Sequence, residues 1–197
     1  MCIRDRGGVV DVGSSKARAT WSPDVDARIG NDTTISAGQD VTLAAYNNFN
    51  EAGSEDTSRR ARATAAATGG GLASIRGADV TVDIDADVDS HVGSGATLNV
   101  GRDLNVRAWS RNRVEGSADG FAAGAIGKGS TVFTANMTDD VYAVTDDATS
   151  GAPTRINGGR FLTFDARSND QSDVSVTGGA GGLYGGCLLY TSDAADE

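Results

Sequence analysis

The sequence predicts an all-β protein, a right-handed parallel β-helix (β-solenoid) built from repeats of about 60 residues. Three observations predict it. Glycine is abundant, with 27 residues, while proline occurs only at Pro23 and Pro153. Apolar residues alternate with polar ones along several stretches, which indicates strands with one buried face. One motif also recurs three times at long spacing, as in architectures that stack repeated units.

The repeat is defined by three stretches that align without gaps: IGNDTTISAGQDVTLAAY at 29–46, VGSGATLNVGRDLNVRAW at 92–109 and SGAPTRINGGRFLTFDAR at 150–167. The anchor glycines of the three copies are Gly38, Gly101 and Gly159. A second glycine lies eight positions before each anchor: Gly30, Gly93 and Gly151. Apolar or small residues follow each anchor at alternate positions: Val41, Leu43 and Ala45; Leu104, Val106 and Ala108; Leu162, Phe164 and Ala166. This period of two predicts an inward-facing strand in each copy.

The anchors lie 63 and 58 residues apart, and we place the difference in the polar segment after each strand. NNFNEAGSEDTSRR is the longest of these segments, SRNRVEGS is shorter, and SNDQSD is shorter still. Surface loops tolerate such variation. A Gly/Ala-rich run follows in each copy, and alternating strands come after it at 77–88 and 131–144.

We expect each repeat to form three coils of roughly 20 residues, with strands of successive coils stacked about 4.8 Å apart. Crossovers between parallel strands are strongly biased to the right hand. A β-sandwich also has short strands and many turns, but it would not repeat one pattern three times.

The two ends of the chain are related to each other. The bases ATG TGT ATA AGA GAC AG encode the start of MCIRDR, residues 1–6, and their reverse complement contains TGT CTC TTA TAC ACA T, which encodes the CLLYT that begins at Cys187. The string resembles the mosaic end of a sequencing transposon. We therefore expect 1–6 and 187–197 to be non-native, adapter-derived scars that add no coil, and 7–186 to be a single β-solenoid fragment of a longer reading frame.

Charge and cysteine content disfavour several function classes. Without the two scars, Lys and Arg fall from 17 to 15 and Asp and Glu from 27 to 23, which leaves a net charge of −8. An acidic surface disfavours nucleic acid and anionic membranes, and no run approaches the roughly 18 apolar residues of a membrane helix. We predict no nucleic-acid partner and no direct membrane insertion. Because Cys2 and Cys187 lie in the scars, we expect no disulfide, thiolate metal site or cysteine nucleophile between them.

The motifs ISAGQDVTLAA, LNVGRDLNVRA and INGGRFLTFDA, separated by Ala/Gly-rich runs, resemble the repeats of large bacterial filamentous adhesins and exoproteins. The resemblance covers 7–186 and is greatest to the leukotoxin-type filamentous adhesin family, whose members resemble filamentous haemagglutinin. It implies secretion across a Gram-negative envelope and a stalk at the cell surface that adheres to a host-cell or extracellular glycan or protein receptor. Neighbouring solenoid repeats would be its other partners. The third copy departs from the motif, because Phe161 stands where the others have Asp40 and Asp103.

An acidic stretch, VDIDADVD at 82–89, predicts four carboxylates on one face of a strand. The four are Asp83, Asp85, Asp87 and Asp89. Carboxylate oxygens suit Ca²⁺, although the spacing is that of neither an EF-hand nor a calcium-binding glycine nonapeptide. The alternative is a solvated face whose self-repulsion opposes aggregation.

Two aromatic residues, Tyr46 and Trp109, follow their anchors by eight positions, where the third copy has Arg167. Stacked on adjacent units, they would form an aromatic ladder that binds the sugar rings of a glycan. The alternative is that they cover a corner of the coil.

Two further motifs predict no chemistry. GAIGKGST at 124–131 echoes a phosphate-binding loop, but Gly129 separates Lys128 from Ser130, so a glycine turn is expected. His91 is the single histidine and has no second histidine or cysteine as partner, which favours a surface or edge position.

We predict no catalytic residue and no cofactor, and thus a structural and adhesive module. The alternative is a fragment of a secreted polysaccharide-active β-helix lyase or hydrolase, which needs acidic or basic groups clustered on adjacent coils.

Overall fold

The computed structural model describes residues 7–146 and 152–195, which contain ten β-strands and no helix. The all-β class predicted from the sequence is confirmed. In chain order the strands are β1 (Gly7–Trp21), β2 (Asp24–Ile29), β3 (Thr34–Ala37), β4 (Val41–Asn47), β5 (Ala61–Val92), β6 (Thr97–Val100), β7 (Asp103–Thr145), β8 (Arg155–Gly158), β9 (Phe161–Gly181) and β10 (Tyr184–Ala195).

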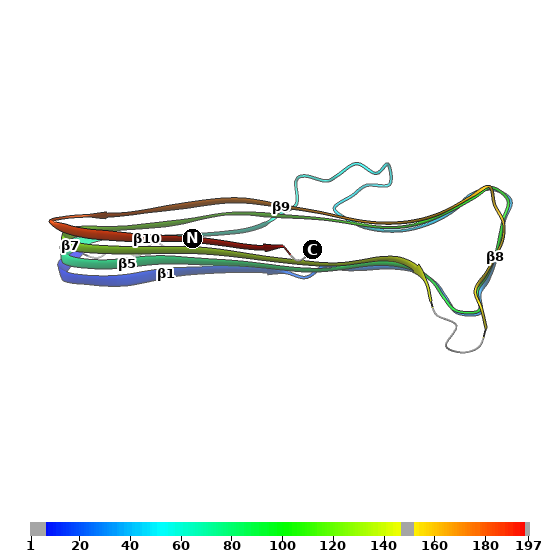
Figure 1. Ribbon diagram of the computed structural model, residues 1–197, viewed down its shortest axis with the longest axis horizontal. Helices are drawn as coiled ribbons and strands as arrows, with labels where there is room; N and C mark the ends of the chain where they lie inside the picture. Colours follow the sequence, from blue (N-terminus) through cyan, green and yellow to red (C-terminus); the bar gives the residue numbers. More distant parts are fainter. Residues whose placement is uncertain (1–6, 147–151, 196–197) are drawn as a thin grey trace.

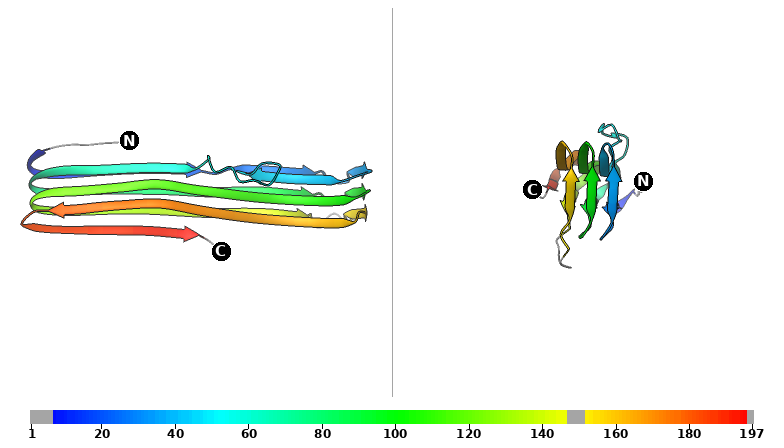
Figure 2. Two further views of the ribbon diagram at one scale, coloured as in Figure 1. Left: turned by 90° about the horizontal axis from the view of Figure 1, so that it is seen from above. Right: turned by 90° about the vertical axis from the view of Figure 1, so that its right-hand side faces the viewer.

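The chain runs in long, flat circuits that lie side by side (Figures 1 and 2). β1, β2 and the second parts of β5 and β7 run along one side, and β4, β9 and the first parts of β5 and β7 return along the other. The short strands β3, β6 and β8 form a three-stranded sheet that closes one end. The circuits turn at the opposite end within the Gly/Ala-rich runs. We call one circuit a layer: layer 1 is 7–69, layer 2 is 70–122 and layer 3 is 123–180.

All pairings between these strands are parallel, and each joins one layer to the next. Val41 lies beside Leu104, which is 63 positions later, and Leu104 lies beside Leu162, which is 58 positions later. These offsets equal the spacings of the repeat anchors, so the register matches the gapless alignment of the three copies.

Each repeat therefore supplies one layer, and the expected coils of roughly 20 residues are wrong. The reason lies in where the chain is able to turn. It turns at the Gly-rich runs and at the two ends of the short strands, whereas alternation continues unbroken through long stretches between them. An unbroken period of two keeps the backbone extended and one face buried throughout.

Changes of register locate the differences in length between layers. The offset between layers 1 and 2 falls from 63 at Asn47 and Ser110 to 53 at Ala61 and Val114, so the loop at 48–60 contains ten additional residues. This agrees with the predicted surface loop. Between layers 2 and 3 the offset rises from 53 at Val92 to 58 at Thr97, which places five additional residues in layer 3 before Arg155.

The second and third polar segments, SRNRVEGS and SNDQSD, are not shortened loops as predicted. Residues 168–181 pair with 110–123 without any shift, so SRNRVEGS belongs to β7 and SNDQSD belongs to β9. Their polar residues alternate between the two faces of the strands, which composition alone did not distinguish from a turn. Gly151 of the third copy lies outside the described residues.

Burial depends on coverage by neighbouring layers. Leu104 and Val106 in layer 2 are 1% and 0% exposed, whereas Leu162 and Phe164 occupy the same positions in layer 3 and are 53% and 38% exposed. The interior between the two long sides contains mainly Ala and Val, with larger side chains such as Ile84 and Phe133 packed among them. At these positions the large apolar side chains are fully buried in the layer that has a neighbouring layer on both sides.

The C-terminal segment differs from expectation. β10 pairs in parallel with β7, from Tyr184 beside Ile126 to Ala195 beside Met137. The expectation that 187–197 adds no coil is therefore wrong for 187–195. An exposed strand edge has unpaired N–H and C=O groups that an extended segment can satisfy, whatever its origin. The adapter origin of both ends stays a prediction, and residues 1–6 lie outside the described residues.

The stacking of the anchor glycines predicts that alanine substitution has different effects on stability at Gly101 and at Gly38. A Cβ on Gly101 would overlap the backbone carbonyl of Gly38 in the layer below, whereas a Cβ on Gly38 meets nothing within 4 Å. We expect Gly101→Ala to destabilise the fold by about 1–3 kcal/mol through overpacking, and Gly38→Ala to stay within about 0.5 kcal/mol. Urea unfolding of both variants measures this, and equal effects would contradict the stacking of the anchors.

Candidate functional site

The aromatic residues predicted from the repeat form a stack across three layers. The rings of Tyr46 and Trp109 lie 5.1 Å apart between centroids, and the Arg167 guanidinium lies 4.9 Å from the Trp109 centroid. The Trp109 indole N–H donates to Asp165 at 3.2 Å. Cation–π contact and ring stacking continue one column through all three copies.

The loop at 48–60 covers this stack from outside. Phe49 contacts Trp109 edge-on, with centroids 5.5 Å apart, and Gly53 lies against the same indole. Glu55 reaches across layers to Arg111 at 2.9 Å and to Asn169 at 2.7 Å. Trp109 is consequently only 7% exposed. The geometry favours the packing interpretation, and glycan binding by Tyr46 and Trp109 stays a prediction.

The acidic face forms as the alternation predicts, on the outer side of β5. Val82, Ile84, Ala86 and Val88 point inward and are buried, while Asp85 and Asp87 are exposed. Asp83 binds Arg18 in layer 1 at 2.8 Å and accepts from Asn136 in layer 3 at 2.7 Å. Thus one of the four carboxylates joins layers.

Neighbouring strands extend this acidic face. Asp87 lies between Asp24 and Asp140 in register, and Asp89 lies beside Asp26. Partial burial, together with Asp87, raises the pKa of Asp89. In the described part of the chain, no group of three or more His, Cys, Asp and Glu side chains is arranged to hold a metal ion. Calcium binding by Asp83, Asp85, Asp87 and Asp89 stays a prediction.

His91 lies at the edge of this face and is half-buried. Its Nε2 is 3.2 Å from Asp26 and 3.0 Å from the Arg28 guanidinium, and its Nδ1 is 3.3 Å from Asp146. The ring therefore joins all three layers, on the outer side of the stack, which agrees with the predicted surface location.

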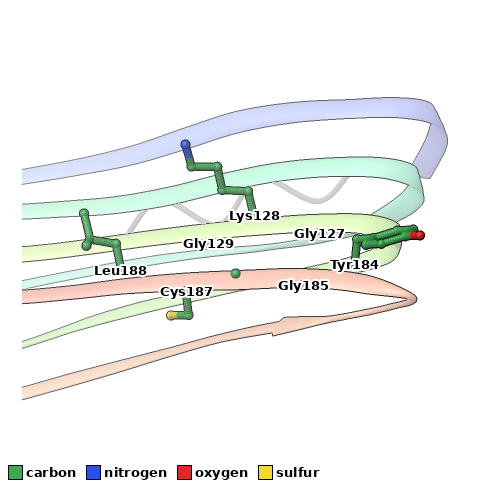
Figure 3. Close-up of a pocket in the computed structure, with 8 residues that line it drawn as sticks. Gly127, Lys128, Gly129, Tyr184, Gly185, Cys187 and Leu188 are labelled. Carbon is green, nitrogen blue, oxygen red and sulfur yellow. The ribbon is translucent and has the colours of Figure 1, made fainter.

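The glycine-rich run GAIGKGST at 124–131 lies inside β7, where the strand turns from one long side to the other (Figure 1), and no helix follows it. Gly127, Lys128 and Gly129 line a shallow pocket of about 480 Å³ together with Tyr184–Leu188 of β10 (Figure 3). Lys128 is the one charged residue of this lining. The arrangement lacks the loop-to-helix geometry of a phosphate site.

A buried ion pair that sequence reasoning missed lies near the same bend. The Arg76 guanidinium donates to the Asp11 carboxylate from Nε at 3.0 Å and from Nη2 at 2.5 Å, and both side chains are almost fully buried. Gly13 and Gly69 leave the space that Arg76 fills. The sequence does contain a signal for this ion pair. Arg76 is a large residue at a position where layers 1 and 3 have Gly13 and Gly129.

A second missed group is a pair of carboxyls facing each other between the two long sides. Asn112, which is fully buried, donates through its side-chain amide to Asp139 and, at 3.1 Å, to Asp170. Ser168 also donates to Asp139, at 2.5 Å. Partial burial, together with the neighbouring charge of Asp139, raises the pKa of Asp170 to about 6. The pair therefore binds a proton more tightly than an isolated aspartate does.

Neither a family model, nor a curated protein, nor a solved structure matches the chain. Among the described residues there is no helix with the length and apolar character needed to cross a membrane.

The buried ion pair predicts unequal effects of breaking two salt bridges. Asp11→Ala leaves Arg76 buried without its carboxylate, so we expect a loss of about 3–5 kcal/mol in unfolding free energy. Asp79→Ala breaks the exposed pair of Asp79 with Lys16, 3.3 Å apart, and should cost less than about 1 kcal/mol. Urea unfolding compares the two variants, and a larger loss for Asp79→Ala would refute the assignment.

The carboxyl pair predicts a dependence of stability on pH. The pKa of Asp170 is raised from 3.8 to about 6 in the folded chain, so the folded state binds more protons than the unfolded state between these values. The contribution of this group to stability therefore falls as pH rises through that window. We expect Asp170→Asn to be more stable than the parent at pH 7, and the difference to disappear near pH 4. Thermal unfolding at both pH values tests this, and a difference that is independent of pH would exclude it.

Proposed function

We propose that the chain is a segment of a right-handed parallel β-solenoid and serves as the structural and adhesive stalk of a secreted or surface-exposed bacterial filamentous adhesin. The observation that carries the proposal is the equality of repeat spacing and strand register. Because successive copies of one motif lie in adjacent layers, further copies extend the same sheets without a change in design.

Contacts between layers support a load-bearing role. The parallel ladders run along both long sides and the closed end, and side-chain columns reinforce them. Ser36, Asn99 and Asn157 form one such column, with amide hydrogen bonds of 3.1 and 3.0 Å. Arg102 pairs with Asp40, and Arg160 pairs with Asp103 in the next layer. Polar side chains at these positions connect layers, which is what length and rigidity require.

The proposed location is extracellular, at the bacterial surface, and the proposed partner is a glycan or protein receptor. The motif resemblance supports this location, and so does the acidic composition, which suits a soluble, repetitive surface. The stalk acts through its length and its outer faces, without catalysis.

A duplicated layer tests the solenoid architecture. A copy of residues 70–122 inserted between Ala122 and Ala123 continues every ladder, provided that the inserted copy contains Arg76→Gly to match Gly13 and Gly129. We expect a protease-resistant protein that is thicker by about 4.8 Å along the stacking axis. Small-angle X-ray scattering and limited proteolysis measure both properties. Rapid cleavage of the inserted copy, with the remainder intact, would disprove stacking of one repeat in each layer.

Adhesion is tested separately, by retention of the full chain on surfaces coated with host-cell glycans or extracellular proteins. Saturable retention is the expected result. Release of reducing or unsaturated ends from acidic or neutral polysaccharides would instead establish the polysaccharide-active alternative.

A further inference from the structure

The outermost face of layer 3 exposes apolar residues that neighbouring layers cover elsewhere. Leu162 and Phe164 lie at the positions that Leu104 and Val106 occupy in layer 2, and Phe161 beside them is 66% exposed. Layer 1 has an open face on the opposite side of the stack, with Val41 and Leu43 at these same positions. The two open faces are therefore copies of surfaces that already pack against each other inside the molecule.

The aromatic column is also incomplete at layer 3. Arg167 lies over Trp109 on one side, and its side chain is 63% exposed. Tyr46 occupies the same position in layer 1. A Tyr46 ring placed on layer 3 would cover the free side of the guanidinium and extend the column by cation–π contact.

The open faces of layers 3 and 1 also carry opposite charges. Asp139 and Asp170 face each other in layer 3, where both accept hydrogen bonds from Asn112 of layer 2. Arg59 lies in the loop of layer 1, two residues before the ladder that begins at Ala61 beside Val114, and its exposed guanidinium is 3.5 Å from Asp56. Arg59 lines an open pocket of about 460 Å³ with Arg60 and Trp21.

We propose that the open face of layer 3 binds the open face of layer 1 of a second copy of this chain, so that copies stack head to tail with Arg59 of the second copy over the carboxyl pair. The proposal rests on the layered architecture of the proposed function and adds a second copy of this chain as the partner of the two faces that no described layer covers. Such an interface joins two different surfaces and does not close on itself, so it produces a growing rod.

β10 limits this assembly. Tyr184 pairs with Ile126, which lies beside Ala73, and Ala73 lies beside Val10 of β1. β10 therefore occupies the place that β1 of a second copy would take, and the two compete for one edge of β7. The strand is held along a single edge, with Leu188 and Tyr190 63% and 57% exposed. Displacement of β10 is thus the step that opens the whole face.

Two prolines in β10 test this competition in the full chain. Successive N–H groups of a strand point to opposite sides, so Leu189→Pro with Tyr190→Pro removes one hydrogen bond to β7 whichever residue supplies it. We expect this variant to form rods at a protein concentration about tenfold lower or more than the parent requires. Sedimentation velocity and negative-stain electron microscopy measure rod formation, and the unfolding midpoint shows that the layers remain folded.

Charge changes in the proline variant test the interface itself. Asp170→Lys places a cation opposite Arg59 and should raise the concentration needed for assembly about tenfold or more. Adding Arg59→Asp to Asp170→Lys reverses both charges and should restore assembly. Asp173→Lys is the control, because Asp173 lies on the outer face of the same strand and pairs with Arg113 of its own chain.

Three results would overturn the proposal: proline variants that stay monomeric while folded, rods that form equally well with Asp170→Lys, or a charge swap that does not restore assembly. If rods do not form but the protein with the duplicated layer still folds, the interface is refuted and the proposed function is not. Failure of the duplicated layer would refute both.

Discussion

Every long strand of this protein satisfies its backbone through a neighbour in another layer, and the rest of the structure depends on that constraint. All pairings between named strands are parallel and join residues more than fifty positions apart. No described layer therefore supplies the ladder hydrogen bonds of its own long strands, and an isolated repeat would leave whole rows of N–H and C=O groups unpaired. Register becomes the property that the sequence must specify, because a shift by one residue would turn every inward side chain outward.

Columns of side chains specify this register by size and charge. Position 101 requires glycine because a Cβ there would overlap the backbone carbonyl of Gly38. Position 13 requires glycine because the buried Arg76 side chain fills the space that a Cβ would need. The ion pair between Arg76 and Asp11 favours one alignment of β1 on β5, because any slip would separate the two buried charges. Loss of a small residue or of a buried charge thus acts on the alignment of whole layers.

Sequence reasoning recovered the column structure because repeats reveal which residues are equivalent. Alternation at Val41, Leu43 and Ala45 identifies the inward face, and the gapless alignment places Tyr46, Trp109 and Arg167 at one position. The number of residues in one circuit could not be predicted from the alternation. A strand of about twenty residues and three short strands with tight corners have the same alternation, and the Gly-rich runs mark a turn without giving its angle.

The groups that the sequence did not reveal depend on contacts across the interior. Asp139 and Asp170 come from opposite long sides of layer 3, and Asn112, which binds both, comes from layer 2. No spacing rule connects them, because the extra residues in layer 3 shift one side relative to the other. The pairing of β10 was missed for a different reason: an unpaired edge accepts an extended segment on backbone hydrogen bonds alone.

Spin labels at Thr42 and Thr163 test one repeat per layer most directly. The substitutions are Thr42→Cys and Thr163→Cys, with Cys2→Ser and Cys187→Ser to remove the other two thiols. Both positions lie beside Asn105, in the layers on either side of it. Two strand spacings place their backbones about 10 Å apart, within the range of dipolar broadening in continuous-wave electron paramagnetic resonance. The account predicts a broadened spectrum for the doubly labelled protein. Coils of roughly 20 residues would separate the two labels by about six spacings, close to 29 Å, and a spectrum equal to the sum of the two single-label spectra would contradict the account.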